Sequence, residues 1–202
     1  MKPRDVVLGG DVTVSERPSW EGDQQEGAPR RGLLMVYTGN GKGKTTAALG
    51  LALRAIGHGQ RVYMLQFMKG DDKYGEIQAA KRYLPPLTIV QSGLPSFVTK
   101  GSPSEEDLAL AGRGVALARE ALSSGRYDLV ILDEINVALE WGLVTLDDVT
   151  GIIRARPAEL DLVLTGRYAH QAVIDAADLV SEVREVKHHY REGVRARAGV
   201  EF

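Results

Sequence analysis

The sequence contains no cysteine. This absence excludes a disulfide framework, a thiolate nucleophile and a metal site built on cysteine. Charge of one sign is not in large excess either, since the formal net charge is −2, which gives no general attraction to nucleic acid or an anionic membrane. No apolar run is long enough to span a bilayer, and the N-terminus lacks the apolar core of a signal peptide. By default we expect a cytoplasmic protein with no nucleic-acid or membrane partner.

The 202 residues, 44% of them hydrophobic and 26% charged, are enough for one α/β domain with a substantial core. The N-terminal part differs in composition. From Asp11 to Gly32 it is rich in Gly, Pro, Glu, Ser and Gln, and such a segment buries too little apolar surface to offset its ordering entropy. We predict a disordered arm over residues 1–31, with Trp20 as a candidate docking residue, and a single domain over 32–202.

Short apolar runs alternate with helical patterns after Gly32. The predicted strands are 33–37, 61–67, 87–91, 127–134, 159–167 and 179–186, and the predicted helices are 44–59, 102–125 with Ser104 as its N-cap, 135–142, 145–157 and 169–177. This alternation predicts an α/β fold with an open, mostly parallel sheet and helices on both faces, similar to P-loop NTPases of the RecA-like kind. Ligands of such sheets bind beyond the carboxyl ends of the strands.

The stretch YTGNGKGKTTAALG, Tyr37 to Gly50, predicts a phosphate-binding loop between a strand and a helix. Its glycines let successive backbone N–H groups point at one anion, and the helix that opens at Lys44 adds its positive end. Lys44 and Lys42 supply charge for phosphate oxygens, and Thr45 stands where the motif places a hydroxyl on Mg²⁺. The first position departs from the usual pattern, because it holds Thr38 in place of glycine.

Two carboxylates follow the apolar run LVIL, where P-loop proteins keep an acid that holds Mg²⁺ directly or through water. Either Asp133 or Glu134 fits that position. Residues that could orient an attacking group in phosphoryl transfer, such as Arg113, do not stand in a recognisable motif. The adjacent histidines His188 and His189 are interpreted as a polar pair in the C-terminal tail, since no further metal ligand stands at a recognisable spacing.

Five segments carry a resemblance to a known family: TGNGKGKTTAALGLALRAIGHG, QFMKG with YGE, YDLVILDEINVALEWGLV, LVLTGR and VKHHYREGVRARAGVEF. In this order they closely resemble ATP:corrinoid adenosyltransferases of the P-loop type, which act on cob(I)alamin or cob(I)yrinic acid a,c-diamide. The resemblance covers residues 32–202. It implies an enzyme in which a Co(I) corrinoid attacks the 5′ carbon of ATP and intact triphosphate leaves. Because cobalt is the nucleophile, such an enzyme needs no general base.

The resemblance also implies roles for individual residues. Lys44 and Lys42 would be the catalytic cations. The triphosphate would be bound by Thr38, Gly39, Asn40, Gly41, Lys42, Gly43, Lys44, Thr45 and Thr46. Mg²⁺, or Mn²⁺, would be held by Thr45 and Glu134, with Asp133 as the less favoured partner.

The corrinoid residues implied by the resemblance are Phe97, Tyr74, Glu76 and Arg167. The family's GFTW-like stretch corresponds here to PSFVT, so that Thr99 takes the place of the tryptophan that helps displace the lower cobalt ligand. The resemblance further implies a homodimer, and a reductant protein is a candidate partner.

Two other classes of function stay open from the sequence. A RecA-like ATPase acting as a switch or motor would account for the P-loop and for LVILDE, but not for TGNGKGKTT or for the C-terminal tail. A carrier that binds a corrinoid and a nucleotide without turnover is the second alternative. The physiological corrinoid is not determined by the sequence.

Overall fold

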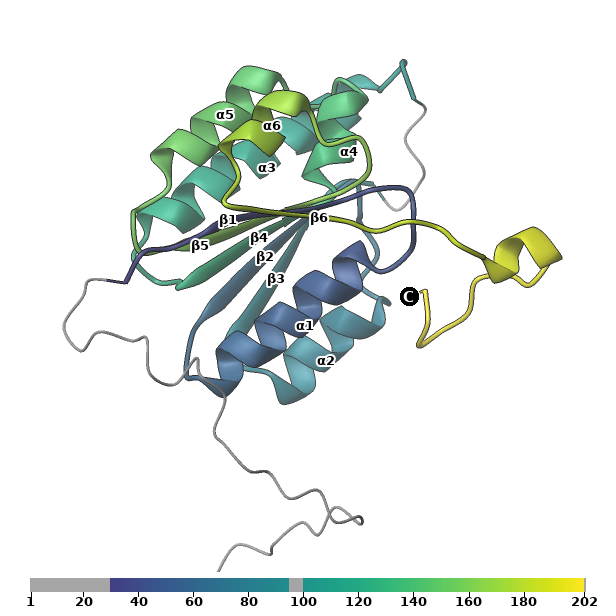
Figure 1. Cartoon of the computed structure of the whole chain (residues 1–202), viewed down its shortest axis with the longest axis horizontal. Coiled ribbons are helices and arrows are strands. Elements are labelled where there is room, and N and C mark those ends of the chain that lie inside the picture. The colour runs from purple at the N-terminus through teal and green to yellow at the C-terminus, as the bar shows by residue number, and fades with distance from the viewer. Residues whose placement is uncertain (1–29, 95–99, 202) are drawn as a thin grey trace, which may run out of the picture. The chain divides into compact units, whose positions relative to one another are not determined.

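Six strands form one parallel β-sheet in the order β3-β2-β4-β5-β1-β6 (Figure 1). The computed structural model describes residues 30–94 and 100–201. Within them the strands are β1 Leu34–Thr38, β2 Val62–Phe67, β3 Leu87–Ser92, β4 Leu129–Asp133, β5 Asp161–Thr165 and β6 Leu179–Glu182. Because every described strand runs in the same direction, their carboxyl ends meet at one edge of the sheet, where the loops that bind ligands are expected.

Helices cover both faces of the sheet (Figure 1). The helices are α1 Lys44–Gly57, α2 Gly75–Tyr83, α3 Glu105–Ser123, α4 Ile135–Glu140, α5 Leu146–Ala155 and α6 Gln171–Ala176, followed by the 3₁₀ helix η2 His189–Glu192. One core cluster joins α1 and α2 to the sheet, and the other joins α3, α4, α5 and α6 to the opposite face. The strands are therefore buried between two layers of helices, as their continuous apolar runs predicted.

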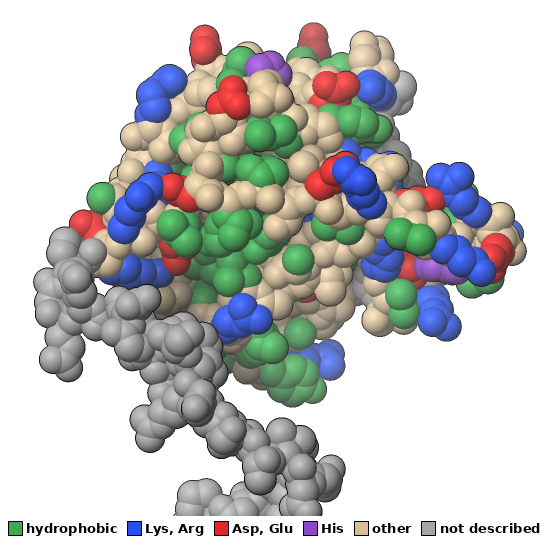
Figure 2. Space-filling view, viewed as in Figure 1, with side chains coloured by type: hydrophobic (Ala, Val, Ile, Leu, Met, Phe, Trp, Pro, Cys, Tyr) green, Lys and Arg blue, Asp and Glu red, His purple; other side chains and the backbone are tan. Residues whose placement is uncertain are grey.

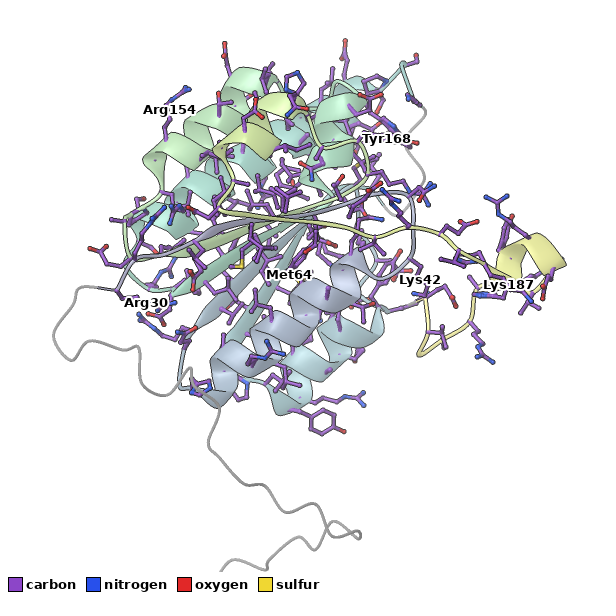
Figure 3. The ribbon with its side chains drawn as sticks, viewed as in Figure 1. Arg30, Lys42, Met64, Arg154, Tyr168 and Lys187 are labelled. Atoms are coloured by element: carbon purple, nitrogen blue, oxygen red, sulfur yellow. The ribbon has the colours of Figure 1, made fainter. Side chains whose placement is uncertain are left out.

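The side chains of strand β2 pack alternately against the two layers of helices. Val62 and Met64 face α1, and Figure 3 shows Met64 between the sheet and that helix. Leu65 and Phe67 point to the opposite face and pack in the cluster that contains α3. All six residues of the strand are buried, so its position is fixed from both sides.

The sheet edge at β6 is different, because all four of its residues are exposed. Figure 2 shows hydrophobic side chains gathered beside this edge, and Leu179 and Val180 are among the exposed large hydrophobic residues. Beyond β6 the chain continues into the tail, where Figure 2 shows many Lys and Arg side chains. The edge strand thus leads directly from the sheet to a polar segment.

The predicted fold class is confirmed, and the sheet is parallel throughout rather than mostly. Ser104 is the N-cap of α3, as predicted, and forms a capping box with Asp107. Helix α2 was not predicted from the sequence, since Ile77 and Ala80 are its only buried residues and give a weak periodic signal. The last strand ends at Glu182, four residues before its predicted end at Val186.

The predicted division into an arm (1–31) and a domain (32–202) stays a prediction, because residues 1–29 lie outside the described part of the chain. Residues 31–202 group by their contacts as one compact unit. Among the described residues, no helix is both long enough and apolar enough to cross a membrane.

Candidate active site

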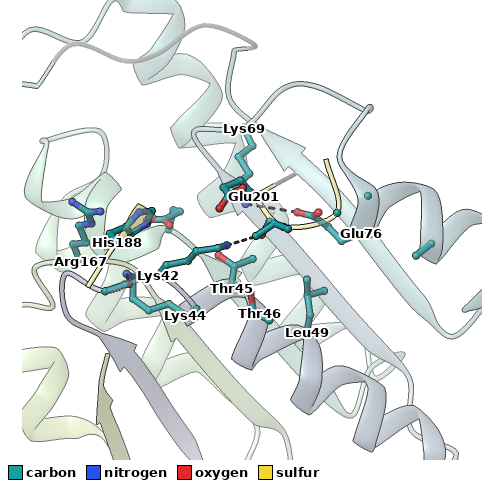
Figure 4. Close-up of a pocket in the computed structure, with 17 residues that line it drawn as sticks. Lys42, Lys44, Thr45, Thr46, Leu49, Lys69, Glu76, Arg167, His188 and Glu201 are labelled. Atoms are coloured by element: carbon teal, nitrogen blue, oxygen red, sulfur yellow. Dashed lines mark hydrogen bonds and ion pairs between the residues drawn. The ribbon is translucent and has the colours of Figure 1, made fainter. Parts of the chain in front are cut away.

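A cavity of about 530 Å³ lies where the phosphate loop meets the carboxyl ends of β2, β4 and β5 (Figure 4). It is lined by residues 41–46 of the loop, Leu49 of α1, Lys69, Gly75, Glu76 and Ala79 after β2, Glu134, Arg167, and His188 with residues 199–201 of the tail. Lysine and arginine side chains line the cavity from the loop, from the segment after β2 and from the end of β5. Three carboxylates, Glu76, Glu134 and Glu201, line the cavity as well, so it is suited to a polyanion that carries a metal cation.

The loop backbone is shaped by its glycines. Gly39 and Gly43 have φ angles of 96° and 122°, a region that residues with a side chain rarely adopt. At Gly41 a Cβ atom would lie 2.7 Å from the backbone carbon of Arg184, and the Gly41 N–H donates to the Val183 carbonyl at 2.8 Å. The expectation that successive loop N–H groups all face one anion is therefore wrong for Gly41, because the chain after β6 accepts its hydrogen bond.

The first turn of α1 keeps its N–H groups for a ligand. Its N-cap is Gly43, and no side chain caps the turn, so the positive end of the helix opens to the cavity. Lys44 is buried, and its Nζ donates to the Gly41 carbonyl at 2.7 Å. Burial lowers the pKa of Lys44, and the charge of Glu134 opposes that shift. The lysine and the helix start are thus held together as one anion site.

Asp133 at the end of β4 is fully buried and accepts hydrogen bonds from several elements. Its Oδ1 accepts from the hydroxyls of Thr45 at 2.8 Å and Thr165 at 2.7 Å. Its Oδ2 accepts from Lys69 at 2.9 Å and from Gln66 at 3.5 Å. The carboxylate therefore joins α1, β5, β2 and the segment after β2 to one point.

Glu134 follows in a left-handed conformation with φ of 61°, immediately before α4. Its backbone N–H donates to the Thr165 hydroxyl at 3.0 Å, which holds the turn. Its side chain lines the cavity, and no described side chain donates a hydrogen bond to it. Burial, and next the charge of Asp133, raises the pKa of Glu134, while Lys69 opposes the shift. Glu134 is therefore the carboxylate that is open to a cation.

The predicted triphosphate residues are divided between two cavities. Residues 41–46 line the first cavity, whereas 38–40 line a neighbouring cavity of about 640 Å³. Thr38 and Asn40 also make structural contacts, because the Thr38 hydroxyl accepts from the Ala169 N–H and the Asn40 Oδ1 accepts from the Glu185 N–H, each at 3.2 Å. The start of the loop is thus tied to the chain around α6 and after β6.

Three of the predicted corrinoid residues lie around the first cavity. Glu76 lines it, and Tyr74 lies beside it with its ring centre 5.3 Å from the Lys69 ammonium. Arg167 lines both cavities. Phe97 lies outside the described residues.

The C-terminal tail supplies residues that the sequence interpretation missed. Lys42 reaches from the loop toward the tail (Figures 3 and 4), where its Nζ donates to the Val200 carbonyl at 2.6 Å. His188 and Glu201 line the same cavity. Lys69 was also missed. The tail segment VKHHYREGVRARAGVEF indicated the family. Its sequence did not indicate which of its residues lie beside the phosphate loop.

Comparison with known proteins places this site in a family. A family model described as ATP:corrinoid adenosyltransferase BtuR/CobO/CobP matches residues 30–202. A corrinoid adenosyltransferase from Pseudomonas aeruginosa is 40% identical over 172 residues, which cover 85% of this chain and 84% of the relative. Corrinoid adenosyltransferase CobA from Salmonella typhimurium is 36% identical over 172 residues, which cover 85% of this chain and 86% of the relative.

Among solved structures, the flagellar accessory protein FlaH from Methanocaldococcus jannaschii is similar with a TM-score of 0.52. The similarity covers 77% of this chain and 73% of that one at 13% identity, so it bears on the fold alone. The family model and the curated relatives bear on more, and they agree with the resemblance found in the motifs. This chain belongs to the ATP:corrinoid adenosyltransferase family.

Proposed function

We propose that the protein transfers the 5′-deoxyadenosyl group of ATP to the Co(I) centre of a corrinoid and releases intact triphosphate. The observation that carries this proposal is the cavity in which the uncapped start of α1, Lys42 and Lys44 meet Glu134 and Arg167, which follow β4 and β5. Such a site is built to bind a triphosphate and to stabilise it as a leaving group. Family membership supports the transfer reaction over ATP hydrolysis and over carriage without turnover.

The bond changes explain what the site has to supply. The electron pair of Co(I) forms a bond to the 5′ carbon of ATP, and the bond between that carbon and the triphosphate oxygen breaks. Cobalt is oxidised to Co(III), and the electron pair of the broken bond leaves with the triphosphate. No proton is removed from either substrate, so the protein has to position the two reactants and stabilise the leaving group.

We assign stabilisation of the leaving triphosphate to Lys44, Lys42 and the N–H groups of the first turn of α1. Lys44 is buried beside that turn, and Lys42 extends from the loop into the cavity wall. Charge is more effective in a partly buried site than in water. Arg167 lies close enough to Lys44 and Glu134 to influence the pKa of both groups, so we assign it to the same anion in addition to its predicted corrinoid role.

The residues present fit a magnesium or manganese ion bound together with ATP. The Thr45 hydroxyl donates a hydrogen bond to Asp133, so the lone pairs of the Thr45 oxygen stay free. The Glu134 carboxylate lines the cavity. In the described part of the chain no three His, Asp or Glu side chains are grouped so that they could hold a metal ion. An ion bound here would therefore take most of its ligands from phosphate and water. We propose that Thr45 and Glu134 hold the ion. When bound, the ion would supply charge neutralisation for the triphosphate.

For the corrinoid we propose contacts to Tyr74, Glu76 and Arg167, and to Phe97 in the loop after β3. The first three residues lie around the loop ends where an adenosyl group would meet its acceptor. We further propose that the protein acts as a cytoplasmic homodimer and receives reduced corrinoid with the help of a reductant protein. Support for these proposals comes from the family resemblance.

The test is an anoxic incubation with Mg-ATP and chemically reduced cob(I)alamin. Light-sensitive adenosylcobalamin would be followed by absorbance and the phosphate products by phosphorus NMR. We expect adenosylcobalamin and triphosphate in equal amounts, with loss of both when Lys44 is replaced by alanine. Lys73→Ala is the matched control, because Lys73 is exposed and does not line the cavity.

The alternatives give different results in the same tubes. ADP and phosphate without a cobalt–carbon product would identify an ATPase. Binding of both ligands with neither product would identify a carrier.

A further inference from the structure

Lys69 is a partly buried cation, and neither the motifs nor the proposed chemistry assigns it a role. It follows β2, its side chain is 18% exposed, and it lines the cavity. Its ammonium group lies 2.9 Å from Asp133 Oδ2 and 3.8 Å from Glu76 Oε1, and it sits over the Tyr74 ring. Burial acts to lower the pKa of Lys69, but the charge and hydrogen bond of Asp133 outweigh this effect and raise it. The carboxylates of Asp133 and Glu76 beside the ammonium group favour its charged form.

Lys69 is the cation that pairs with the fully buried carboxylate of Asp133. An unpaired buried carboxylate is strongly unfavourable, and Lys69 supplies the opposite charge for Asp133. A carboxylate has about four lone-pair positions. The hydroxyls of Thr45 and Thr165 bind Oδ1, while Lys69 and Gln66 bind Oδ2. Protein donors thus approach both oxygens of Asp133, which favours Glu134 over Asp133 as the carboxylate that contacts a metal ion.

The hydrogen bonds to Asp133 orient two groups that line the cavity, the Thr45 hydroxyl and the Glu134 carboxylate. Thr45 has a single hydroxyl hydrogen, and since it is donated to Asp133, the oxygen lone pairs are available to a cation. Thr165 likewise donates to Asp133, and its oxygen accepts the Glu134 N–H at 3.0 Å. That second bond holds the left-handed turn which places the Glu134 side chain in the cavity.

We propose that Lys69 is a positioning residue: it holds Asp133 as an acceptor for Thr45 and Thr165, so that the Thr45 hydroxyl and the Glu134 carboxylate face the metal ion of ATP. This inference rests on the proposed function for the presence of a metal–ATP complex. It gives the two neighbouring carboxylates different roles: Asp133 accepts the hydrogen bonds that orient the site, and Glu134 contacts the ion. Lys69 acts through Asp133 and not through the substrate.

The test is a double-mutant cycle on Mn²⁺ binding, measured by electron paramagnetic resonance with ATP present and no corrinoid. The variants are Lys69→Met, Asp133→Asn and the double variant, with Lys73→Met as the matched control. Lys73 is an exposed lysine in the same segment and lies outside the cavity. We expect each single variant to weaken Mn²⁺ binding by about tenfold or more, as is typical when an outer-shell partner of a metal ligand is lost. The double variant should be no weaker than the poorer single variant.

If the fold-losses in Mn²⁺ affinity of the two single variants multiply in the double variant, the proposal is overturned, because Lys69 then acts independently of Asp133. Unchanged Mn²⁺ binding in Lys69→Met would overturn it as well. If Lys69→Met does not fold, the comparison of Asp133→Asn with the double variant still decides, since neither leaves a buried carboxylate unpaired, and these two are expected to bind Mn²⁺ equally. Adenosyl transfer by the unaltered enzyme is measured separately, so failure of the proposed function is distinguishable from failure of the Lys69 inference.

Discussion

The Thr45 hydroxyl donates a hydrogen bond of 2.8 Å to Asp133 and so joins the first turn of α1 to the end of β4. These two residues belong to segments far apart in the sequence, one at the start of α1 and one at the end of β4. Their contact makes the loop and the acidic strand end a single unit. It also makes Thr45 the simplest residue at which to test the proposed metal contact.

Replacing Thr45 with valine removes the hydroxyl but keeps nearly the same shape. We expect the rate of adenosyl transfer at fixed Mg-ATP to fall by about 10-fold to 100-fold, because the cation loses an oxygen and Asp133 loses a donor. Thr45→Ser should retain most of the activity, and Thr150→Val on α5 should retain all of it. Full activity in Thr45→Val would show that the hydroxyl does not contact the ion. The measurement is the initial rate of adenosylcobalamin formation.

Deleting residues 199–202 removes the carbonyl that holds Lys42. We expect the ATP dissociation constant, measured by titration calorimetry, to rise about threefold to tenfold, since Lys42 would lose a conformation already directed to the cavity wall. Val200→Ala keeps the backbone carbonyl and should bind ATP as the unaltered protein does. Tighter binding after the deletion would mean that the tail competes with the triphosphate for Lys42.

Two glycines of α3 should respond in opposite ways to alanine. At Gly114 a Cβ atom would lie 2.7 Å from the Phe67 ring and 2.7 Å from the Ser92 hydroxyl, so overpacking is expected to lower the free energy of unfolding by about 1–3 kcal/mol. At Gly112 nothing lies within 4 Å, and the gain in helix propensity is expected to raise it by about 0.5–1 kcal/mol. Urea unfolding of both variants checks the pair, and a stabilising Gly114→Ala would contradict the packing described for α3.

Burial, together with the neighbouring Tyr127, raises the pKa of Tyr63 to about 12. In the unfolded chain a tyrosine titrates near 10. Between these pH values the folded state keeps a proton that the unfolded chain releases, so the stability due to neutral Tyr63 is complete below pH 10 and is lost as the pH rises toward 12.

Tyr63→Phe should therefore lose less stability than the unaltered protein between about pH 9.5 and 11.5, as measured by urea unfolding. Tyr83→Phe is the matched control because Tyr83 is 74% exposed. Identical pH slopes for Tyr63→Phe and the unaltered protein would refute the assignment.

The parts of the site that were predictable from the sequence are contiguous in it. The strand, glycine turn and helix around Lys44 follow one another directly, and apolar periodicity is enough to place them. The acids after LVIL directly follow an apolar strand in the sequence. They were predictable as site residues because the carboxyl ends of parallel strands meet at one edge of the sheet. Helix α2 escaped prediction because few of its residues are buried.

Contacts between distant segments were not predictable from one sequence. The pairing of Lys69 with Asp133 depends on β2 lying next to β4, and the pairing of Lys42 with Val200 depends on the path of the tail after β6. Local propensity carries no information on either arrangement. The hydrogen bond from the Gly41 N–H to the Val183 carbonyl was not predictable either, because it depends on β6 lying beside β1.

The strand order has a consequence for synthesis of the chain. Of the described strands β1 is made first, yet among them it bonds only to β5 and β6, with Leu34 opposite Leu162 and Met35 opposite Leu179. Its apolar residues therefore have no strand partner until β5, residues 161–165, has left the ribosome, and non-local pairing of this kind is slow and exposed to aggregation. The phosphate loop follows β1 directly, so ATP can help the nascent chain fold only when translation is nearly complete.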